Sequence, residues 1–261
     1  MRYPLISDIH ANLPALEAVL RDIAGRDGVD ATYHLGDLVG YAPWPNEVVE
    51  MLVARGIPGV AGNYDSTVAT DYKHCGCHYE DSRQEELSHL SYVWTREHVT
   101  ARTKASLGAL PFRIDLRPNG GHVAGPTVTL VHGNHTLNTV YVHHDRSDAF
   151  LEKMGTALGA RAGDVVCFGH THVPWHRVVE GVNYVNTGSV GRPKDGDWRA
   201  SYVLLDVGAL SVKAEIVRVD YDVDAAAQAI IASALPEDLA EYLRHGGAAA
   251  TARPSHPAGG P

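Results

Sequence analysis

The first 63 residues alternate between short apolar segments and longer segments with a helical period. The apolar segments end at Asp8, Asp37 and Asn63, and the helical patterns between them cover residues 12–25 and 45–56. In the helical patterns apolar residues recur every three or four positions, which places them on one face. This alternation predicts a β-α-β-α-β unit whose strands lie beneath their helices. We therefore expect an α/β fold.

The rest of the chain combines a polar helical stretch with a second series of strands. Few strand signals occur in residues 66–110, where a helix is expected from about Asp81 to Lys104. Further strand patterns, and helices around 147–158 and 223–245, follow. We predict one domain over residues 1–245 with a helical insertion at about 66–110. The Gly/Ala/Pro-rich tail, 246–261, is expected to be disordered.

Composition excludes several classes of function. No apolar run approaches the roughly 18 residues of a membrane helix, and no signal-peptide pattern precedes the first strand, so we expect a cytoplasmic protein. The net charge of −9 argues against a broad nucleic-acid surface. It leaves a phosphate substrate open, because a local metal charge outweighs a diffuse negative surface. Three cysteines supply no disulfide framework, and nothing sets the oligomeric state.

Polar residues of ligand type stand at the ends of the predicted strands. Because ligand sites in α/β sheets form at the carboxyl ends of strands, these side chains are expected to converge. On an extended backbone His170 and His172 would point the same way and could aim at one point. The complete set is Asp8, His10, Asp37, Asn63, His132, His170 and His172.

Seven ligands are too many for one tetrahedral ion. They suit two divalent ions about 3.5–4 Å apart that share a carboxylate. The mixture of oxygen and imidazole ligands favours Mn, Fe, Zn or Ni over Mg or Ca.

The ordered motifs "SDIH", "HLGD", "AGNYD", "LVHG" and "FGHTH" resemble those of the calcineurin-like metallophosphoesterase family. The flanking "LGDLVGYAPWPNEVV" and "NTGSVGRPKDGDWRASY" look like its small bacterial cytosolic branch. The resemblance covers roughly residues 5–220. It implies two facing mixed β-sheets flanked by helices.

The resemblance also implies roles for the ligands. Asp8, His10 and His172 would hold one ion, and Asn63, His132 and His170 the other. Asp37 would bridge the two ions, and a bridging hydroxide would attack phosphorus in line.

One position departs from the family pattern. The family has a histidine after the asparagine, and that histidine usually protonates the leaving group. Here Tyr64 stands in its place. A tyrosine with a pKa near 10 is a poorer acid at neutral pH. Either Tyr64 donates a hydrogen bond or proton, or His135 replaces it, or the substrate's leaving group needs little protonation. We favour a role for Tyr64 in shaping the site.

Two further clusters have competing interpretations. His74, Cys75, Cys77 and His78 have soft-ligand chemistry, but their tight spacing favours a loop beside the site over a structural zinc. Arg192 and Lys194 lie in a loop, where they are either exposed charges or cations near the substrate's oxygens.

The resemblance therefore implies a metal-dependent phosphoesterase, and diesters are the expected substrates. The substrate would be a small phosphate ester or a nucleotide-like molecule. The alternatives are a phosphomonoesterase or protein phosphatase, and a non-catalytic scaffold that keeps the metals. A metallo-β-lactamase-type hydrolase is disfavoured because "GHTHVPW" lacks the expected Asp-His pair.

Overall fold

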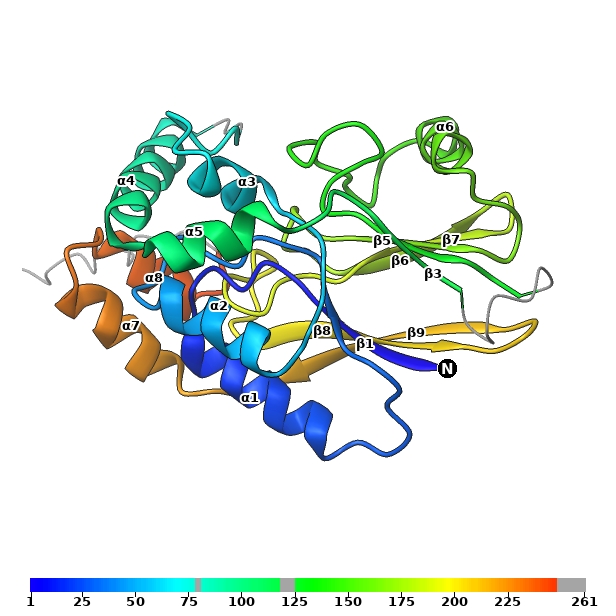
Figure 1. Ribbon diagram of the computed structural model, residues 1–261, viewed down its shortest axis with the longest axis horizontal. Helices are drawn as coiled ribbons and strands as arrows, with labels where there is room; N and C mark the ends of the chain where they lie inside the picture. Colours follow the sequence, from blue (N-terminus) through cyan, green and yellow to red (C-terminus); the bar gives the residue numbers. More distant parts are fainter. Residues whose placement is uncertain (78–80, 118–124, 248–261) are drawn as a thin grey trace, which may run out of the picture.

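A computed structural model of the chain describes residues 1–77, 81–117 and 125–247. These residues form two β-sheets with helices around them (Figure 1). The strands are β1 (Arg2–Ile6), β2 (Tyr33–His34), β3 (Ile114–Leu116), β4 (Val128–Leu130), β5 (Val165–Phe168), β6 (Trp175–Val179), β7 (Val182–Asn186), β8 (Ala200–Val207) and β9 (Val212–Val219). The helices are α1 (Leu13–Ala24), α2 (Pro45–Ala54), α3 (Asn63–Ala69), α4 (Ser82–His98), α5 (Ala101–Gly108), α6 (Asp148–Leu158), α7 (Val223–Ala232) and α8 (Asp238–Arg244).

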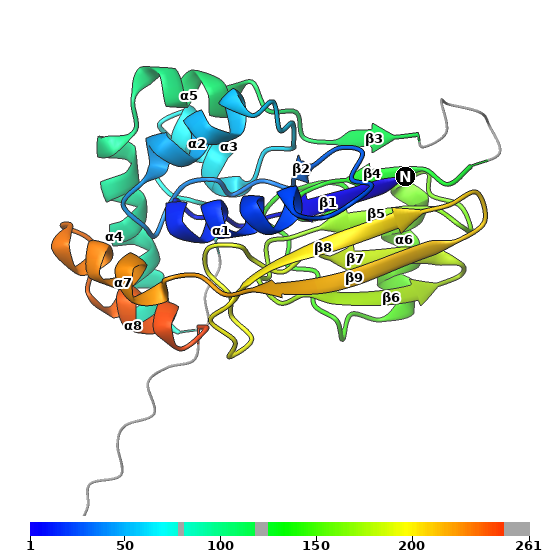
Figure 2. The same ribbon diagram turned by 90° about the horizontal axis from the view of Figure 1, so that it is seen from below.

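Both sheets mix parallel and antiparallel strands. The four-stranded sheet has the order β2-β1-β8-β9, with β1 parallel to β2 and antiparallel to β8. The five-stranded sheet has the order β3-β4-β5-β7-β6, in which the three central strands are parallel. Parallel neighbours need long crossovers, which α1 supplies between β1 and β2 and α6 between β4 and β5. The predicted α/β fold with two facing mixed sheets is confirmed (Figure 2).

The two sheets pack face to face between outer layers of helices. Strand β8 shows this arrangement, because Val203 and Leu205 join the core between the sheets. Tyr202 and Leu204 point the other way and pack with α1 and α7. This is the alternation expected of a strand covered on both faces. On the outer face of the five-stranded sheet, Leu151 of α6 packs in one cluster with strand residues.

One predicted strand is wrong. Residues 57–62 form no strand, and one isolated bridge joins His34 to Gly59. Pro58 has no N–H to donate to a ladder, which limits the pairing of this segment. Instead the segment leads into α3, whose first residue is the predicted ligand Asn63. Strand β3 was not expected from the sequence pattern.

The helical region and the tail are described only in part. Helices α4 and α5 lie within the predicted insertion at 66–110, and the single domain over residues 1–245 stays a prediction. The tail predicted to be disordered begins with Gly246 and Gly247, and both make backbone hydrogen bonds. Gly246 accepts from Gly196, and Gly247 donates to Tyr242. Residues 248–261 lie outside the described part of the chain.

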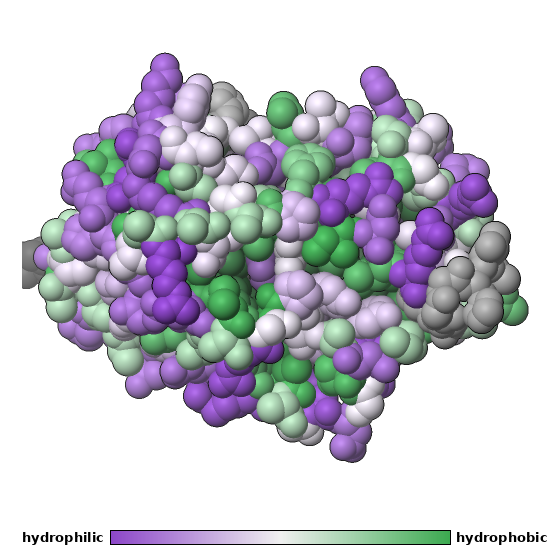
Figure 3. Space-filling model, viewed as in Figure 1, coloured by the Kyte–Doolittle hydropathy of each residue, from purple (hydrophilic) through white to green (hydrophobic). Residues whose placement is uncertain are grey.

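Figure 3 shows one face of the molecule. Hydrophilic residues prevail along its outer edges, and hydrophobic residues form smaller groups between them. Within the described residues, no helix has the length and apolar character needed to cross a membrane.

Candidate metal centre

The loops after four strands bring six of the predicted ligands into two buried groups. One group contains Asp8, His10 and His172, and the other contains Asp37, His132 and His170. Within each group the ligand atoms lie within 4.8 Å of one another. The seventh predicted ligand, Asn63, is fully buried beside the second group.

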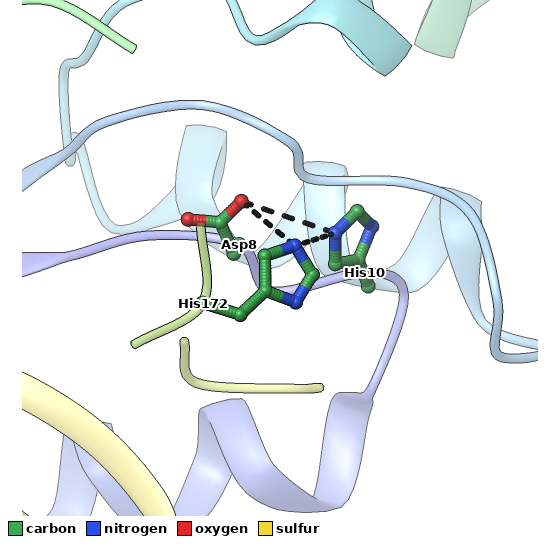
Figure 4. A group of neighbouring side chains, drawn as sticks. All are labelled: Asp8, His10 and His172. Atoms are coloured by element: carbon green, nitrogen blue, oxygen red, sulfur yellow. Dashed lines mark hydrogen bonds and ion pairs between the residues drawn. The ribbon is translucent and has the colours of Figure 1, made fainter. Parts of the chain in front are cut away.

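In the first group three electron-rich atoms face one another (Figure 4). The Nε2 atoms of His10 and His172 are 3.1 Å apart, and Asp8 Oδ1 lies 3.3 Å from His172 Nε2. Each histidine places Nδ1 against a backbone carbonyl, that of Val39 at 3.0 Å for His10 and that of Arg192 at 2.6 Å for His172. Nδ1 must therefore carry the proton, and each Nε2 presents a lone pair to the group.

The second group is built in the same way. His132 donates Nδ1–H to the Leu35 carbonyl at 2.7 Å. Its Nε2 lies 3.2 Å from Asn63 Oδ1, 3.2 Å from His170 Nδ1 and 3.4 Å from Asp37 Oδ2. The second group therefore offers two imidazoles, a carboxylate and an amide oxygen.

Asp37 lies between the two groups. Its Oδ2 atom is 3.4 Å from His132 Nε2 and 3.7 Å from His10 Nε2. Its other oxygen, Oδ1, accepts the Tyr64 backbone N–H at 2.9 Å. One carboxylate oxygen is thus placed where both groups can share it.

The donor set fits divalent cations. Burial lowers the pKa of His10 to about 3, and it also lowers the pKa of His172 well below its ordinary value. Two neutral rings therefore face Asp8 Oδ1, a buried atom that has no hydrogen-bond partner. Burial opposes protonation of His132, but Asp37, Asp8 and the Leu35 carbonyl together outweigh burial and raise its pKa to about 9. A metal cation would replace the proton that Asp37 draws to this ring.

The backbone at the ligands is strained. Asp8, His10, Asp37, His170 and His172 have φ values between 48° and 65°. This left-handed region costs a residue with a side chain roughly 1–2 kcal/mol. Such strain is concentrated at functional sites, where surrounding contacts maintain it.

The same geometry corrects the expectation for the His170–His172 pair. The two residues follow β5 in a left-handed conformation and do not continue an extended strand. They belong to different groups, His172 with Asp8 and His170 with Asp37, which is the division that the family motifs implied.

Two neighbouring segments orient the second group. Asp65 accepts backbone N–H bonds from Asp37, Leu38 and Gly62, at 2.8, 2.8 and 2.9 Å, so it fixes the loop after β2 against the start of α3.

The amide of Asn63 is oriented by the cysteine loop. Its Nδ2 donates to the Cys75 carbonyl at 3.0 Å and to Cys77 Sγ at 3.2 Å. This leaves Oδ1 facing His132. Cys75 and Cys77 belong to neither ligand group among the described residues, and His78 lies outside them.

A small cavity opens onto both ligand groups. Its lining includes four candidate ligands together with Tyr41, Tyr64, Cys77, Tyr141 and Lys194. The motifs predicted Tyr64 at the site, whereas nothing in the pattern marked Tyr141, whose ring stacks on His170 with centroids 4.0 Å apart.

The two candidates for protonating the leaving group lie differently. The Tyr64 ring packs edge-on against His10, and its hydroxyl lies 2.9 Å from Ser88 Oγ on α4. His135 is half-buried and is not among the residues that line the cavity.

The two cations of the loop after β7 also lie differently. Arg192 is buried, with its guanidinium 3.9 Å above the Tyr41 ring and 3.3 Å from Gln84 Oε1. Lys194 reaches the cavity. Burial and the nearby Arg192 lower the pKa of Lys194 to about 7. The interpretation of both residues as exposed charges is therefore wrong.

The sequence and the fold match known proteins. A profile described as "Calcineurin-like phosphoesterase superfamily domain" matches residues 1–209. The uncharacterized protein MJ0912 of Methanocaldococcus jannaschii is 32% identical over 260 residues, with 92% of this chain and 96% of the relative covered. Phosphodiesterase YfcE of Escherichia coli is 28% identical over 222 residues, covering 81% of this chain and 91% of YfcE.

A solved structure has a similar fold along nearly the whole chain. The metallophosphoesterase from Sphaerobacter thermophilus superposes with a TM-score of 0.71 at 29% identity, covering 94% of this chain and 99% of that one. The protein PH1004 from Pyrococcus horikoshii shares the fold with a TM-score of 0.78 at 22% identity, covering 95% and 99%.

Proposed function

Because the chain belongs to the calcineurin-like phosphoesterase superfamily, we propose that it hydrolyses phosphate esters with two metal ions and prefers phosphodiesters. The observation that carries this proposal is the pair of buried ligand groups with Asp37 Oδ2 lying 3.4 Å from His132 Nε2 in one group and 3.7 Å from His10 Nε2 in the other. The relative YfcE is named a phosphodiesterase, which supports the preference for diesters. The substrate would be a small phosphate ester or a nucleotide-like molecule.

Each ligand has a proposed place. Asp8, His10 and His172 would hold one ion. His132, His170 and Asn63 would hold the other, and Asp37 would be shared. Mn, Fe, Zn or Ni suits this mixture of imidazole and oxygen ligands. When bound, such ions would lower the pKa of a water molecule and stabilise the charge that develops on the phosphoryl oxygens.

The protein's own groups prepare the site for this chemistry. Backbone carbonyls hold three of the four rings with Nε2 directed inward. The aromatic residues Tyr41, Tyr64 and Tyr141 line the cavity beside the ligands. With the Tyr64 hydroxyl against Ser88, this position supplies no imidazole acid. Substrates with acidic leaving groups should therefore react fastest.

The test is hydrolysis of bis(p-nitrophenyl) phosphate and of p-nitrophenyl phosphate after metal is stripped and Mn²⁺ is added back. We expect metal-dependent turnover that favours the diester, with two ions per chain by elemental analysis. Faster turnover of the monoester would favour a monoesterase or protein phosphatase. Two bound ions without hydrolysis of either ester would favour a scaffold role.

Asp37→Asn tests the ligand assignment in the same assay. The substitution removes the shared negative charge, so we expect metal content and turnover to fall together, with turnover reduced at least about 100-fold. The exposed Asp27→Asn makes the same chemical change in the loop after α1 and should retain both properties. Full metal content and activity in Asp37→Asn would contradict the assignment.

A further inference from the structure

The site lacks the histidine that usually faces the leaving group in this family, so another side chain must meet the negative charge that develops there. In-line displacement puts the leaving oxygen on the side of phosphorus opposite the attacking oxygen. The candidate ligands form one part of the cavity lining, and the other lining residues are therefore the ones to consider.

Two of these residues direct their hydroxyl groups elsewhere. Tyr41 donates its hydroxyl to Ser88 Oγ at 2.9 Å, and the Tyr64 hydroxyl lies 2.9 Å from the same atom. Burial raises the pKa of Tyr41 to about 12. Both phenol groups are thus turned towards α4, and their rings form the wall.

The remaining lining residues are Cys77, Tyr141 and Lys194. The Cys77 sulfur accepts the Asn63 amide, and the Tyr141 ring stacks on His170. Of the residues that line this cavity in the described chain, Lys194 is the one that carries an amino group.

The position of Lys194 is fixed by contacts on both sides of its backbone. Its N–H faces the His172 carbonyl at 3.4 Å, which ties it to the first ligand group. On the other side the chain at Gly247 is so close that an added Cβ there would lie 2.7 Å from Lys194 Cα. The backbone of Lys194 is therefore held between the first ligand group and the end of the described chain, and the residue lines the cavity.

We propose that Lys194 is a catalytic residue whose ammonium group stabilises the negative charge on the leaving oxygen. The inference rests on the proposed function. The oxygen of a water molecule forms a new P–O bond and releases its proton to solvent. The P–O bond to the leaving group breaks, its electron pair goes to the leaving oxygen, and solvent water later supplies the proton of the released alcohol. A fixed cation in an enclosed site stabilises such a charge more strongly than solvent does.

The test is the dependence of kcat on the leaving group in a series of aryl phosphodiesters. Lys194→Gln should lower kcat by about 10- to 1,000-fold, and the loss should grow as the pKa of the leaving phenol rises. Lys194→Arg keeps the charge but cannot act as an acid at neutral pH, so it should restore most of the rate and the wild-type slope.

Three controls make the result specific. Lys213→Gln removes an exposed amino group that pairs with Glu215 on β9, and it should leave kcat unchanged. Tyr141→Phe removes the other candidate donor and should keep the wild-type slope. Metal content should be equal in all variants, and Lys194→Gln should bind inorganic phosphate about tenfold more weakly by calorimetry, because phosphate places an oxygen at the leaving position.

Several outcomes would overturn the proposal. An equal loss of activity for every leaving group in Lys194→Gln would give the residue a structural role. A steeper slope in Tyr141→Phe would assign the charge to the phenol. Both results require an active wild-type enzyme, so they would leave the proposed function standing. A metal-loaded wild-type protein that hydrolyses no ester would reject the proposed function itself.

Discussion

At the scale of single residues, the orientation of each ligand depends on the atom behind it. His10, His132 and His172 each donate Nδ1–H to a backbone carbonyl, which leaves Nε2 for a metal. Asn63 uses its amide nitrogen on the cysteine loop, which leaves its oxygen. Such outer contacts typically change metal affinity by about 10- to 100-fold when they are removed. The orientation of these four ligands is thus set by groups that are not ligands themselves.

Tyr64→Phe tests whether the hydroxyl at this position has a chemical role. Because that hydroxyl lies against Ser88, we expect turnover of the nitrophenyl diester to stay within about threefold and the free energy of unfolding to fall by about 1 kcal/mol. Denaturant unfolding and steady-state kinetics measure the two effects.

Ser88→Ala provides the matched control for Tyr64→Phe. It removes the other partner of the same contact, so the two substitutions combined should cost less stability than the sum of the single changes. If Tyr64→Phe instead slowed turnover by about 100-fold or more, the phenol would have a direct part in the reaction.

At the scale of elements, short edge segments replace regular strands around the site. Strand β2 contains two residues, and one isolated bridge joins its second residue, His34, to Gly59. Gly59 packs so tightly on this strand that an added Cβ would lie 2.3 Å from the His34 ring. The close approach encloses His34, and burial lowers its pKa to about 3 from an ordinary value of 6.5.

This buried histidine should make the free energy of unfolding fall in acid. The folded pKa lies below the unfolded pKa, so the unfolded chain binds more protons between them. The neutral ring therefore contributes full stability above about pH 6.5, and this contribution is lost as the pH falls towards 3. One pKa unit corresponds to about 1.4 kcal/mol, so the loss should reach a few kcal/mol.

Denaturant unfolding of metal-free protein at pH 7.5 and pH 4.5 measures this effect. His34→Leu removes the titrating ring and should lose less stability than the wild type between the two pH values. Val60→Ala, a non-titrating change in the buried segment beside His34, should lower stability by a similar amount at both. Equal acid sensitivity of the wild type and His34→Leu would contradict this explanation.

At the scale of the whole molecule, the site lies where the two sheets meet. Asp8 and His10 follow a strand of the four-stranded sheet, and His170 and His172 follow a strand of the other. The His170 backbone N–H donates to Asp8 Oδ2 at 3.0 Å across this junction. Each ligand group combines residues from both sheets or their adjoining loops, so the packing of the sheets is needed to assemble the site.

Gly169→Ala tests this dependence. An added Cβ at this position would lie 2.1 Å from Ser7 Oγ and 2.4 Å from Asp8 Oδ2, so atoms at the junction of the two sheets would have to shift. We expect a loss of about 1–3 kcal/mol in the free energy of unfolding. The rise in melting temperature on adding Mn²⁺ should also become smaller, because ions that bind the folded state stabilise it by an amount that grows with the logarithm of their affinity.

Gly108→Ala serves as the control for crowding. There the nearest atom to an added Cβ is 3.6 Å away, which is an ordinary contact. It should therefore keep the wild-type response to Mn²⁺. If Gly169→Ala kept the wild-type stability and the wild-type response to Mn²⁺, the site would not depend on close packing at this junction, and the prediction would be wrong.

The sequence by itself determined the parts that depend on consecutive residues. Apolar periodicity predicted most strands and helices, because the pattern of burial along one element is local. The polar residues after Ile6, Leu130 and Phe168 marked the edge where ligands gather, because strand ends converge at one side of a sheet. The five ordered motifs indicated the family to which the chain belongs.

Tertiary structure decided what depends on residues far apart in the chain. It produced the grouping that the family motifs implied, His172 with Asp8 and His170 with Asp37, through contacts that span up to 164 positions. It turned Tyr64 towards Ser88 and brought Lys194 into the cavity. The physical reason is that a side chain's direction at these sites is set by strained loops and by neighbours from other elements, and no local period encodes either.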